Sequence, residues 1–185
     1  MEPVILETPR LVLRPLGAGD TEAVHRACQD EEIQRWTTVP SPYLPVHARD
    51  FVEQIAPDGW RDDTLYNWGS FTREGGALVS SVGLSFPARA GVAEIGYWTA
   101  REHRGRGYTA EAVAAATRWA FTALGVQRLE WYAEAGNEAS RAVVERVGFT
   151  FEGTLRSYLL HRGERRDAWV GAMLPTDPVR DPAVG

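Results

Sequence analysis

Hydrophobic and polar residues alternate along some stretches of this chain and recur with helical spacing along others. The alternation through Leu11 and Leu13 predicts one half-buried strand over residues 4–16. Asp20 then stands where a helix N-cap is expected, and apolar residues at 23, 24, 27 and 28 predict a helix that ends near Trp36. The chain therefore begins with a strand followed by a helix.

The middle of the chain changes from an irregular segment to strands. Residues 38–47 are rich in proline, and residues 47–60 return to helical spacing, so we expect a helical flap that carries aromatic side chains. Two strand-like runs then flank residues 73–76, whose two glycines are typical of a hairpin turn. The pattern of residues 91–100 predicts a third strand. We predict that these three consecutive strands are antiparallel.

The clearest helix begins at Gly107, where apolar residues follow at spacings of three and four as far as Gly125. A strand over 126–134, a short helix between Asn137 and Gly148, and two strands that turn near Gly163 complete the pattern. We predict a single domain over residues 1–175 and a disordered tail over residues 176–185.

Composition narrows the class of protein. The chain has 185 residues, 44% of them hydrophobic, which suits one domain, and no long apolar run or basic leader marks a membrane span or signal peptide. We expect a cytoplasmic protein. The net charge of −5 argues against nucleic acid or a membrane surface as a partner.

Several chemistries are excluded by residue type. The 20 basic residues are all arginine, so a lysine Schiff base and a P-loop lysine are ruled out. The single cysteine, Cys28, lies in a helical pattern and is interpreted as an ordinary reduced side chain. The four histidines lack ligand spacing, so no metal site is expected.

The sequence Arg104-Gly105-Arg106-Gly107 stands at the start of the clearest helix. A helix N-terminus presents unpaired amides and about half a positive charge, and glycines let a loop close around an anion. We therefore favour a pyrophosphate site over a solvated loop. The glycines also fit the loose dinucleotide pattern G-x-G-x-x-A, but a polar spacer precedes them and about 90 residues of another pattern come first, which disfavours a dinucleotide-binding oxidoreductase.

These motifs together resemble a known family. RGRGYT at 104–109 is similar to the acyl-CoA loop of the GNAT N-acetyltransferases, written Q/R-x-x-G-x-G/A, except that Thr109 replaces the last glycine or alanine. The segments TPRLVLRPL, EIGYW, AEAGNEASRAVVERVGF, FEGTLR and RRDAW resemble the branch that acetylates ribosomal-protein N-termini and small amines. The resemblance extends from Leu6 to Leu174.

The resemblance implies an α/β (α+β) fold. It has a mixed, mostly antiparallel sheet of about seven strands, flanked by helices and splayed between the fourth and fifth strands, EIGYWT and RLEWYA. Pantetheine would enter the gap beside the backbone of Trp98 and Thr99, with Asn137 and Ser140 near the sulfur. The amides that would hold the pyrophosphate belong to Arg104, Gly105, Arg106, Gly107, Tyr108 and Thr109.

The sequence offers more than one candidate for the catalytic groups. Many members of the family use a tyrosine as general acid where this chain has Val144, so Ser140 is the replacement candidate. Glu94 and Glu134 are both candidates for a general base that acts through water, and each has a competing structural role. An acceptor pocket is expected from the aromatic residues Trp36, Tyr43, Trp60 and Trp68.

The resulting hypothesis is an acetyl-CoA-dependent N-acetyltransferase that transfers the acetyl group directly to a primary amine, on a protein N-terminus or a small molecule. Acetyl-CoA is the co-substrate, no metal is required, and the chain can assemble as a homodimer. The alternative is a regulatory module that binds acyl-CoA and catalyses nothing: Asn137 and Ser140 favour the enzyme, and the missing tyrosine favours the module.

Overall fold

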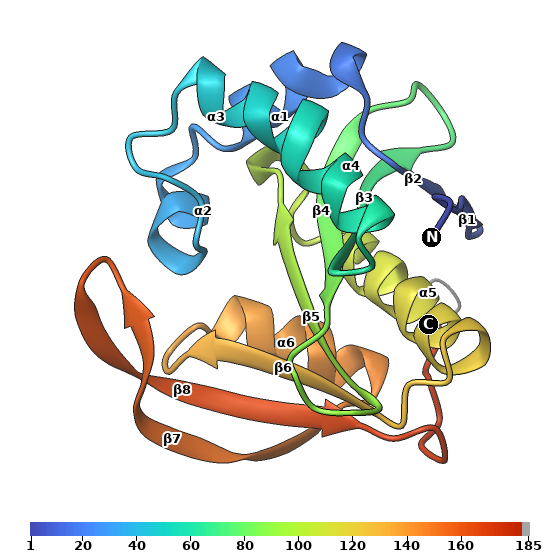
Figure 1. Cartoon of the computed structure of the whole chain (residues 1–185), viewed down its shortest axis with the longest axis vertical. Helices are drawn as coiled ribbons and strands as arrows, with labels where there is room; N and C mark the ends of the chain where they lie inside the picture. Colours follow the sequence, from blue (N-terminus) through green and yellow to red (C-terminus); the bar gives the residue numbers. More distant parts are fainter. Residues whose placement is uncertain (183–185) are drawn as a thin grey trace.

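A single eight-stranded sheet runs through the molecule in the order β1-β2-β3-β4-β5-β6-β8-β7 (Figure 1). The computed structural model describes residues 1–182. The strands are β1 (Leu6–Glu7), β2 (Leu11–Arg14), β3 (Leu65–Thr72), β4 (Leu78–Ser85), β5 (Val92–Thr99), β6 (Arg128–Glu134), β7 (Thr150–His161) and β8 (Glu164–Met173).

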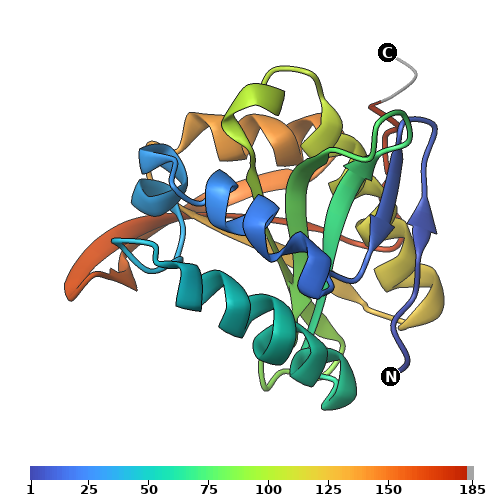
Figure 2. The ribbon, with the colours of Figure 1, turned by 90° about the horizontal axis from the view of Figure 1, so that it is seen from above.

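Helices cover both faces of this sheet (Figure 2). They are η1 (Ala18–Asp20), α1 (Thr21–Ala27), α2 (Glu31–Trp36), α3 (Pro45–Asp50), η2 (Phe51–Ile55), α4 (Ala56–Arg61), η3 (Arg101–His103), α5 (Tyr108–Ala123) and α6 (Glu138–Val147). Helices α1 to α4 lie on one side of the strands, and α5 and α6 lie on the other. Among the described residues, no helix is long and apolar enough to cross a membrane.

The expected fold is confirmed, with one difference in the strand count. Residues 4–16 form two antiparallel strands, because Thr8 and Pro9 make a tight turn in which the Leu11 amide donates to Thr8 Oγ1 at 2.9 Å. The helix predicted over 20–36 is likewise interrupted between α1 and α2, and the carboxylate of Asp20 binds Arg14 instead of capping the helix.

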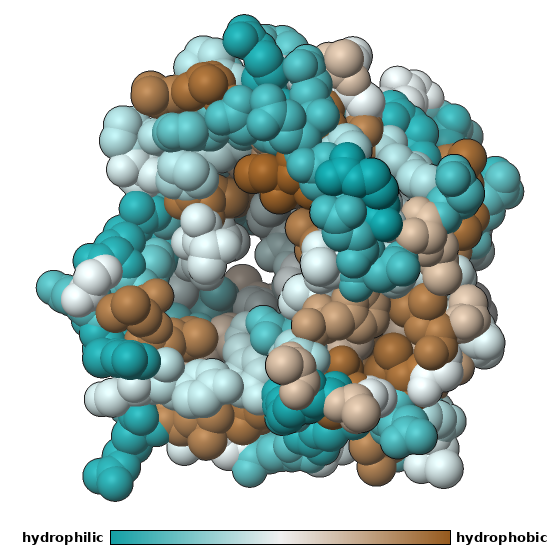
Figure 3. Space-filling model, viewed as in Figure 1, coloured by the Kyte–Doolittle hydropathy of each residue, from teal (hydrophilic) through white to brown (hydrophobic). Residues whose placement is uncertain are grey.

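Strands β5 and β6 are the one parallel pair among the strands of residues 1–182, and their pairing is short. The register runs from Val92 opposite Arg128 to Glu94 opposite Glu130 and then stops. Beyond it the strands diverge, as the resemblance implied, and Figure 3 shows a hollow in the middle of the molecule in that view. A dinucleotide-binding fold needs a doubly wound parallel sheet, so that alternative is wrong.

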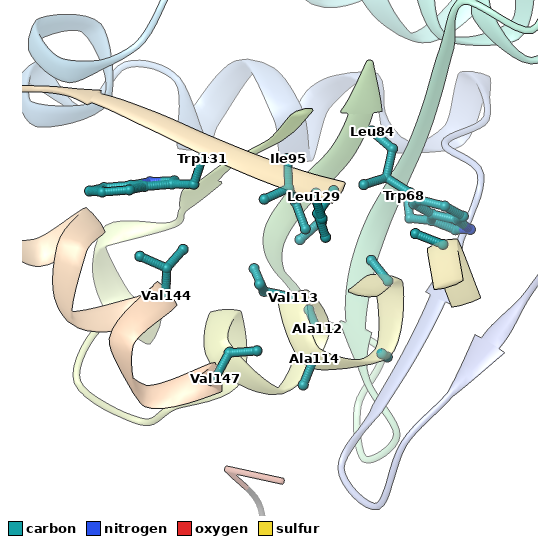
Figure 4. Close-up of a cluster of buried hydrophobic side chains, with 14 of the residues drawn as sticks. Trp68, Leu84, Ile95, Ala112, Val113, Ala114, Leu129, Trp131, Val144 and Val147 are labelled. Carbon is teal, nitrogen blue, oxygen red and sulfur yellow. The ribbon is translucent and has the colours of Figure 1, made fainter. Parts of the chain in front are cut away.

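Alternation along the strands divides the interior into two cores. On one face, Ile95 and Leu129 pack against the alanine-rich helix α5, whose small side chains allow close approach to the sheet, and against Val144 and Val147 of α6 (Figure 4). On the other face, Trp98 packs with side chains of α1 to α3 and of the following helical turn. By the same alternation, Gly96 lies on the face of β5 that carries Trp98, so its missing side chain leaves space on that face.

Glu111 connects the start of α5 to the turn between β1 and β2. Its carboxylate is 1% exposed and accepts hydrogen bonds from Thr8 Oγ1 at 2.6 Å, from the Arg10 amide at 2.9 Å and from Arg10 Nε at 2.6 Å. Besides complementing the N-terminus of α5, this network positions the first turn of the helix against the sheet edge.

The C-terminal segment differs from the expected disordered tail. The amide of Arg180 donates to the Val147 carbonyl at 2.9 Å, Arg146 Nη2 donates to the Pro182 carbonyl at 3.2 Å, and Val179 packs against the first core. Residues 177–182 therefore lie against the end of α6. Residues 183–185, the rest of the predicted tail, lie outside the described residues.

Replacing Glu111 with alanine is expected to lower the unfolding free energy by about 2–3 kcal/mol, because Thr8 and Arg10 lose their shared buried acceptor. Urea denaturation measures this change. Glu145→Ala is the matched control: its carboxylate pairs with Arg141 at 2.7 Å but is 47% exposed, so its loss is expected to cost less than about 0.5 kcal/mol. Equal effects of the two substitutions would contradict the structural role of Glu111.

Candidate active site

The divergence of β5 and β6 leaves two facing strand edges without a common ladder. Residues 95–99 pair with β4 on one side only, and residues 131–134 pair with β8 on one side only. The backbone groups along these inner edges are therefore available to an extended ligand. Above the middle of β5, a Cβ built on Gly96 would meet no atom within 4 Å, so open space lies over this strand.

The loop after β5 approaches the start of α5 through two left-handed glycines. Gly105 has φ of 74° and Gly107 has φ of 75°, a conformation that other residues adopt only with strain. Gly107 is the N-cap of α5, and the first amide that bonds back to it is that of Glu111, at 3.1 Å. The amides of Tyr108, Thr109 and Ala110 consequently have no acceptor within the helix.

The arginines around this loop differ from the expectation. Arg104 is used within the protein, because its guanidinium binds Asp30 and donates to the Thr99 carbonyl at 3.3 Å. The exposed side chain of Arg106 has no hydrogen bond or ion pair within residues 1–182. Arg10 and Arg146, which sequence reasoning missed, come close to the N-cap: a Cβ on Gly107 would lie 3.5 Å from Arg10 Nη2 and 3.6 Å from Arg146 Nη1.

Thr109, the departure from the family pattern, has a structural partner. Its hydroxyl lies 2.6 Å from that of Thr99, and the side chain is 4% exposed. The hydroxyl pair joins the end of β5 to the first turn of α5. A threonine at this position therefore faces the interior and leaves its backbone amide at the helix entrance.

Asn137 and Ser140 meet the splayed strands at the start of α6. Asn137 is the N-cap, and its Oδ1 accepts the Ser140 amide at 3.1 Å, as the sequence predicted. The Ser140 hydroxyl accepts from Trp131 Nε1 at 3.0 Å and donates to the Tyr97 hydroxyl at 3.0 Å. Tyr97 was not recognised from sequence, although the alternation in EIGYW places it on the same strand face as Ile95.

Val144, which replaces the family's usual tyrosine, is 1% exposed and lies beneath Trp131 in the first core (Figure 4). A tyrosine there would enter a filled core. The hydroxyl groups nearest to the diverging strands at this level are instead those of Ser140 and Tyr97, each half-buried.

Glu94 is half-buried at the last paired position of β5 and faces the side of the sheet that carries α1 to α4. Burial raises its pKa, the neighbouring Glu130 raises it further, and Arg89 partly offsets the rise. Glu130 itself binds Arg89 at 2.5 Å and Arg128 at 2.8 Å, whereas Glu94 has no ion pair within residues 1–182. A carboxylate with a raised pKa and no ion-pair partner is a stronger base than an ordinary surface carboxylate.

Glu134 has a different environment. Its carboxylate receives both ends of the Arg35 guanidinium, at 2.6 and 2.9 Å, and lies 3.2 Å from His161 Nδ1. The Arg35 hydrogen bonds lower the pKa of Glu134 to about 2 against desolvation by burial, with a further contribution from His161. Such a carboxylate is a weak base, so Glu94 is the better candidate of the two.

Two arginines join α2 to the part of the sheet that contains β6 to β8. Arg35 belongs to α2, Glu134 ends β6, and Arg162, in the turn between β7 and β8, donates to the backbone carbonyl of Gln34. We call the contacts of Arg35 and Arg162 the rim clasp. A cavity of about 220 Å³ lies beside the clasp and is lined by Glu31, Gln34, Arg35, Ser41 and Arg162.

The aromatic residues expected in an acceptor pocket divide in two. Trp60 and Trp68 are 2% and 0% exposed. Trp60 stacks on Tyr66, and Trp68 meets Trp60 and Trp119 edge to face, so both rings belong to the core. Tyr43 is 5% exposed in the second core. Only Trp36, half-buried on α2 under the Arg35 guanidinium, remains near the rim. Long aromatic side chains fit a pocket wall and a core equally well by pattern, and only packing distinguishes them.

Among residues 1–182, no group of three or more histidine, cysteine or acidic side chains is arranged to hold a metal ion. The buried Cys28 has its pKa raised to about 12 by desolvation, which makes it a poor nucleophile.

Comparison with known proteins establishes the class. Residues 10–150 match the family model of the acetyltransferase (GNAT) domain, so the chain belongs to the GNAT family and is an acyltransferase. It is 29% identical over 164 residues to the uncharacterized N-acetyltransferase YoaA of Bacillus subtilis (strain 168), covering 88% of this chain and 92% of YoaA.

Two solved structures share the fold. Ribosomal-protein-S5-alanine acetyltransferase from Vibrio fischeri has a TM-score of 0.79 at 20% identity, covering 94% of this chain and 97% of its own. Mycobacterium smegmatis RimJ in complex with CoA-disulfide has a TM-score of 0.82 at 23% identity, covering 98% of this chain and 91% of its own.

The rim clasp predicts how stability depends on pH. Because the folded pKa of Glu134 is about 2 and its ordinary value is 4.5, its ionic contribution is present above about pH 4.5 and disappears as the pH falls toward 2. Glu134→Gln is expected to lower the unfolding free energy by about 1–2 kcal/mol at pH 7, with a smaller deficit at pH 3.5. Urea denaturation at both pH values tests this. Glu164→Gln, whose carboxylate is 66% exposed, serves as the control; a deficit in Glu134→Gln that is independent of pH would indicate lost packing instead.

Proposed function

We propose that this acyltransferase moves an acetyl group directly from acetyl-CoA to a primary amine, either a protein N-terminal α-amine or a small-molecule amine. The observation that carries the proposal is the continuous path from the diverging edges of β5 and β6 to the glycine loop at the start of α5. One half of this path suits an extended amide chain, and the other half suits an anion.

The residues present fit the CoA part of the substrate. The loop offers several donors: the amides at the start of α5, the exposed guanidinium of Arg106, and the nearby Arg10 Nη2 and Arg146 Nη1, while other nitrogens of these two arginines bind Glu111, the Arg106 carbonyl and the Pro182 carbonyl. The open space around Gly105, where a Cβ would meet nothing within 4 Å, leaves room for a phosphate group. The free edge at Trp98 and Thr99 supplies backbone partners for pantetheine. The CoA-disulfide in the RimJ structure supports this assignment.

Glu94 is the proposed proton acceptor, and Ser140 is the proposed hydrogen-bond donor to the leaving sulfur. Glu94 takes a proton, through water, either from the substrate ammonium before it attacks or from the nitrogen of the tetrahedral adduct, while Ser140 directs its hydroxyl hydrogen at the sulfur. The neutral nitrogen forms the new C–N bond as the carbonyl π pair moves to the oxygen. When the carbonyl re-forms, the C–S bond breaks and its electron pair goes to the sulfur, and the proton lost by nitrogen balances the one that sulfur finally gains. Because Cys28 is buried with a raised pKa, direct transfer is favoured over a covalent enzyme intermediate.

The acceptor enters from the face that carries α1 to α4, because Glu94 and the open space over Gly96 lie on that face. An α-amine of pKa about 8 is about 10% neutral at pH 7, whereas an alkyl amine near pKa 10.4 is only about 0.04% neutral. Glu94 is consequently more important for an alkyl amine. Both acceptor classes remain within the proposal.

The experiment is a screen of acceptors. Purified protein is mixed with acetyl-CoA and a panel of peptides with free N-termini and small primary amines, and free thiol release is followed together with the product mass. Thiol release matched by an acetylated amine supports the enzyme. Tight acetyl-CoA binding without transfer to any peptide or amine would instead support the non-catalytic acyl-CoA module.

Gly107→Glu is expected to abolish CoA binding, because the substitution puts a carboxylate and a Cβ at a left-handed N-cap surrounded by phosphate donors. Isothermal titration calorimetry with CoA measures the loss, and circular dichroism confirms that the variant folds. Arg104→Ala is expected to have a smaller, indirect effect, since its guanidinium is occupied by Asp30. A folded Gly107→Glu variant that binds CoA like the parent would refute the loop assignment.

Glu94→Gln is expected to lower kcat about 100-fold at pH 7 for an alkyl amine acceptor. The difference in kcat between the variant and the parent should become smaller as the pH rises, because a larger share of the amine is then already neutral in solution and no longer needs Glu94 to remove its proton. Steady-state kinetics between pH 6 and 9 provide the test. A deficit that stays constant up to pH 9 would show that Glu94 orients the substrate without accepting its proton.

A further inference from the structure

Three side chains form a hydrogen-bonded bridge across the diverging strands. Trp131 of β6 donates from Nε1 to Ser140 Oγ at 3.0 Å, Ser140 Oγ donates to the Tyr97 hydroxyl at 3.0 Å, and that hydroxyl donates to the Ser140 carbonyl at 2.7 Å. Tyr97 lies on β5 and Ser140 on α6, so the bridge joins both sides of the gap beyond the last paired residues.

The bridge as it stands occupies the hydrogen that Ser140 needs for the sulfur. A serine hydroxyl has one hydrogen and two lone pairs. Here the hydrogen points to Tyr97, and one lone pair accepts from Trp131. The proposed contact of Ser140 with the leaving sulfur therefore requires this hydrogen to be released.

Two coupled hydroxyl rotations achieve the release: the Ser140 hydrogen turns away from Tyr97, and the Tyr97 hydrogen takes its place in the contact. When the Tyr97 hydrogen turns from the Ser140 carbonyl to Ser140 Oγ, the same 3.0 Å contact is kept with donor and acceptor exchanged. The Ser140 carbonyl, in the first turn of α6, still accepts the amide four residues later in the helix, so the rotation leaves no buried acceptor unpaired. Ser140 Oγ then accepts from both Trp131 and Tyr97, and its own hydrogen is free.

We propose that Tyr97 is a positioning residue whose hydroxyl alternates between the Ser140 carbonyl and Ser140 Oγ, and thereby aims the Ser140 hydrogen at the sulfur of CoA. The inference rests on the proposed function and adds a named partner to its Ser140. Two donors on one oxygen polarise its O–H bond, so the serine becomes a stronger hydrogen-bond donor to the developing thiolate. Burial raises the pKa of Tyr97, which keeps the phenol protonated and able to donate.

Kinetics test the coupling between the two hydroxyls. Ser140→Ala is expected to lower kcat about 10- to 100-fold with little change in KM for acetyl-CoA. Tyr97→Phe is expected to lower kcat about 5-fold, as for the loss of one hydrogen bond of about 1 kcal/mol. The double variant should be no slower than Ser140→Ala alone, because Tyr97 acts only through Ser140. Rates are normalised to active sites by CoA titration.

Tyr66→Phe is the matched control. Its hydroxyl also makes a hydrogen bond, to Asp63 at 2.7 Å, but belongs to the aromatic cluster around Trp60, so kcat should stay at the parent value. Additive losses in the double variant, or a Tyr97→Phe variant as fast as the parent, would overturn the positioning role.

A second measurement does not depend on turnover. The thiol pKa of bound CoA is titrated by the ultraviolet absorbance of the thiolate, and it should lie below that of free CoA in the parent protein. Ser140→Ala and Tyr97→Phe should each move it toward the free value, and Tyr66→Phe should not. A thiol pKa unaffected by Tyr97→Phe would refute the inference even in a protein that transfers acetyl groups. A parent that lowers the thiol pKa but acetylates no amine would refute the proposed function and leave the Tyr97 contact supported.

Discussion

The early end of the β5–β6 pairing is the constraint on which the rest of the site depends. After Glu94 and Glu130 the two strands share no ladder, and each is held only by its outer neighbour, β4 or β8. A sheet normally satisfies both edges of a central strand. Here two facing edges stay open inside the domain. The loop and helix α5 at one end, and Asn137 with Ser140 on α6, are placed around that opening.

The elements around this opening are held in place by contacts between different helices and strands. Glu111 fixes the start of α5 to the β1–β2 turn, the hydroxyls of Thr99 and Thr109 fix it to β5, and Ser140 joins Tyr97 to Trp131. These polar contacts are buried or half-buried, where an unpaired group is costly, so each one specifies a single arrangement. The alanine-rich face of α5 supplies the apolar packing beneath them.

Much of this architecture could be predicted from the sequence. Alternation and helical spacing located most elements, and the glycines of the loop indicated a helix entrance, because only glycine adopts the left-handed backbone there without strain. Asn137 stood at the start of the short helical pattern that Gly148 ends, a place where asparagine commonly caps a helix. The family resemblance then supplied the mixed, mostly antiparallel character of the sheet and the position of the splay, which local patterns do not contain.

What escaped the sequence depends on contacts between distant residues. Arg10 and Arg146 are far from the loop along the chain, and nothing local marks them as its neighbours. The carboxylates of Glu94 and Glu134 looked alike until the structure gave one an arginine and left the other unpaired. Trp60 and Trp68 were expected in the acceptor pocket because the sequence does not show whether an aromatic ring is packed inside the core or lines a pocket.

The rim clasp limits the shape of the acceptor that the proposed function requires. Arg35 bound to Glu134 joins α2 to the end of β6, and Arg162 bound to the Gln34 carbonyl joins α2 to the β7–β8 turn. Figure 3 shows the hollow surrounded by protein in that view. A ring differs from a groove in topology: a chain can be laid sideways into a groove, but it must be threaded through a ring by a free end. Under the proposed function, a closed clasp favours a chain terminus, a protruding side chain or a small molecule as the group that reaches Glu94, and the middle of a polypeptide backbone reaches it only after the contacts of Arg35 and Arg162 have broken.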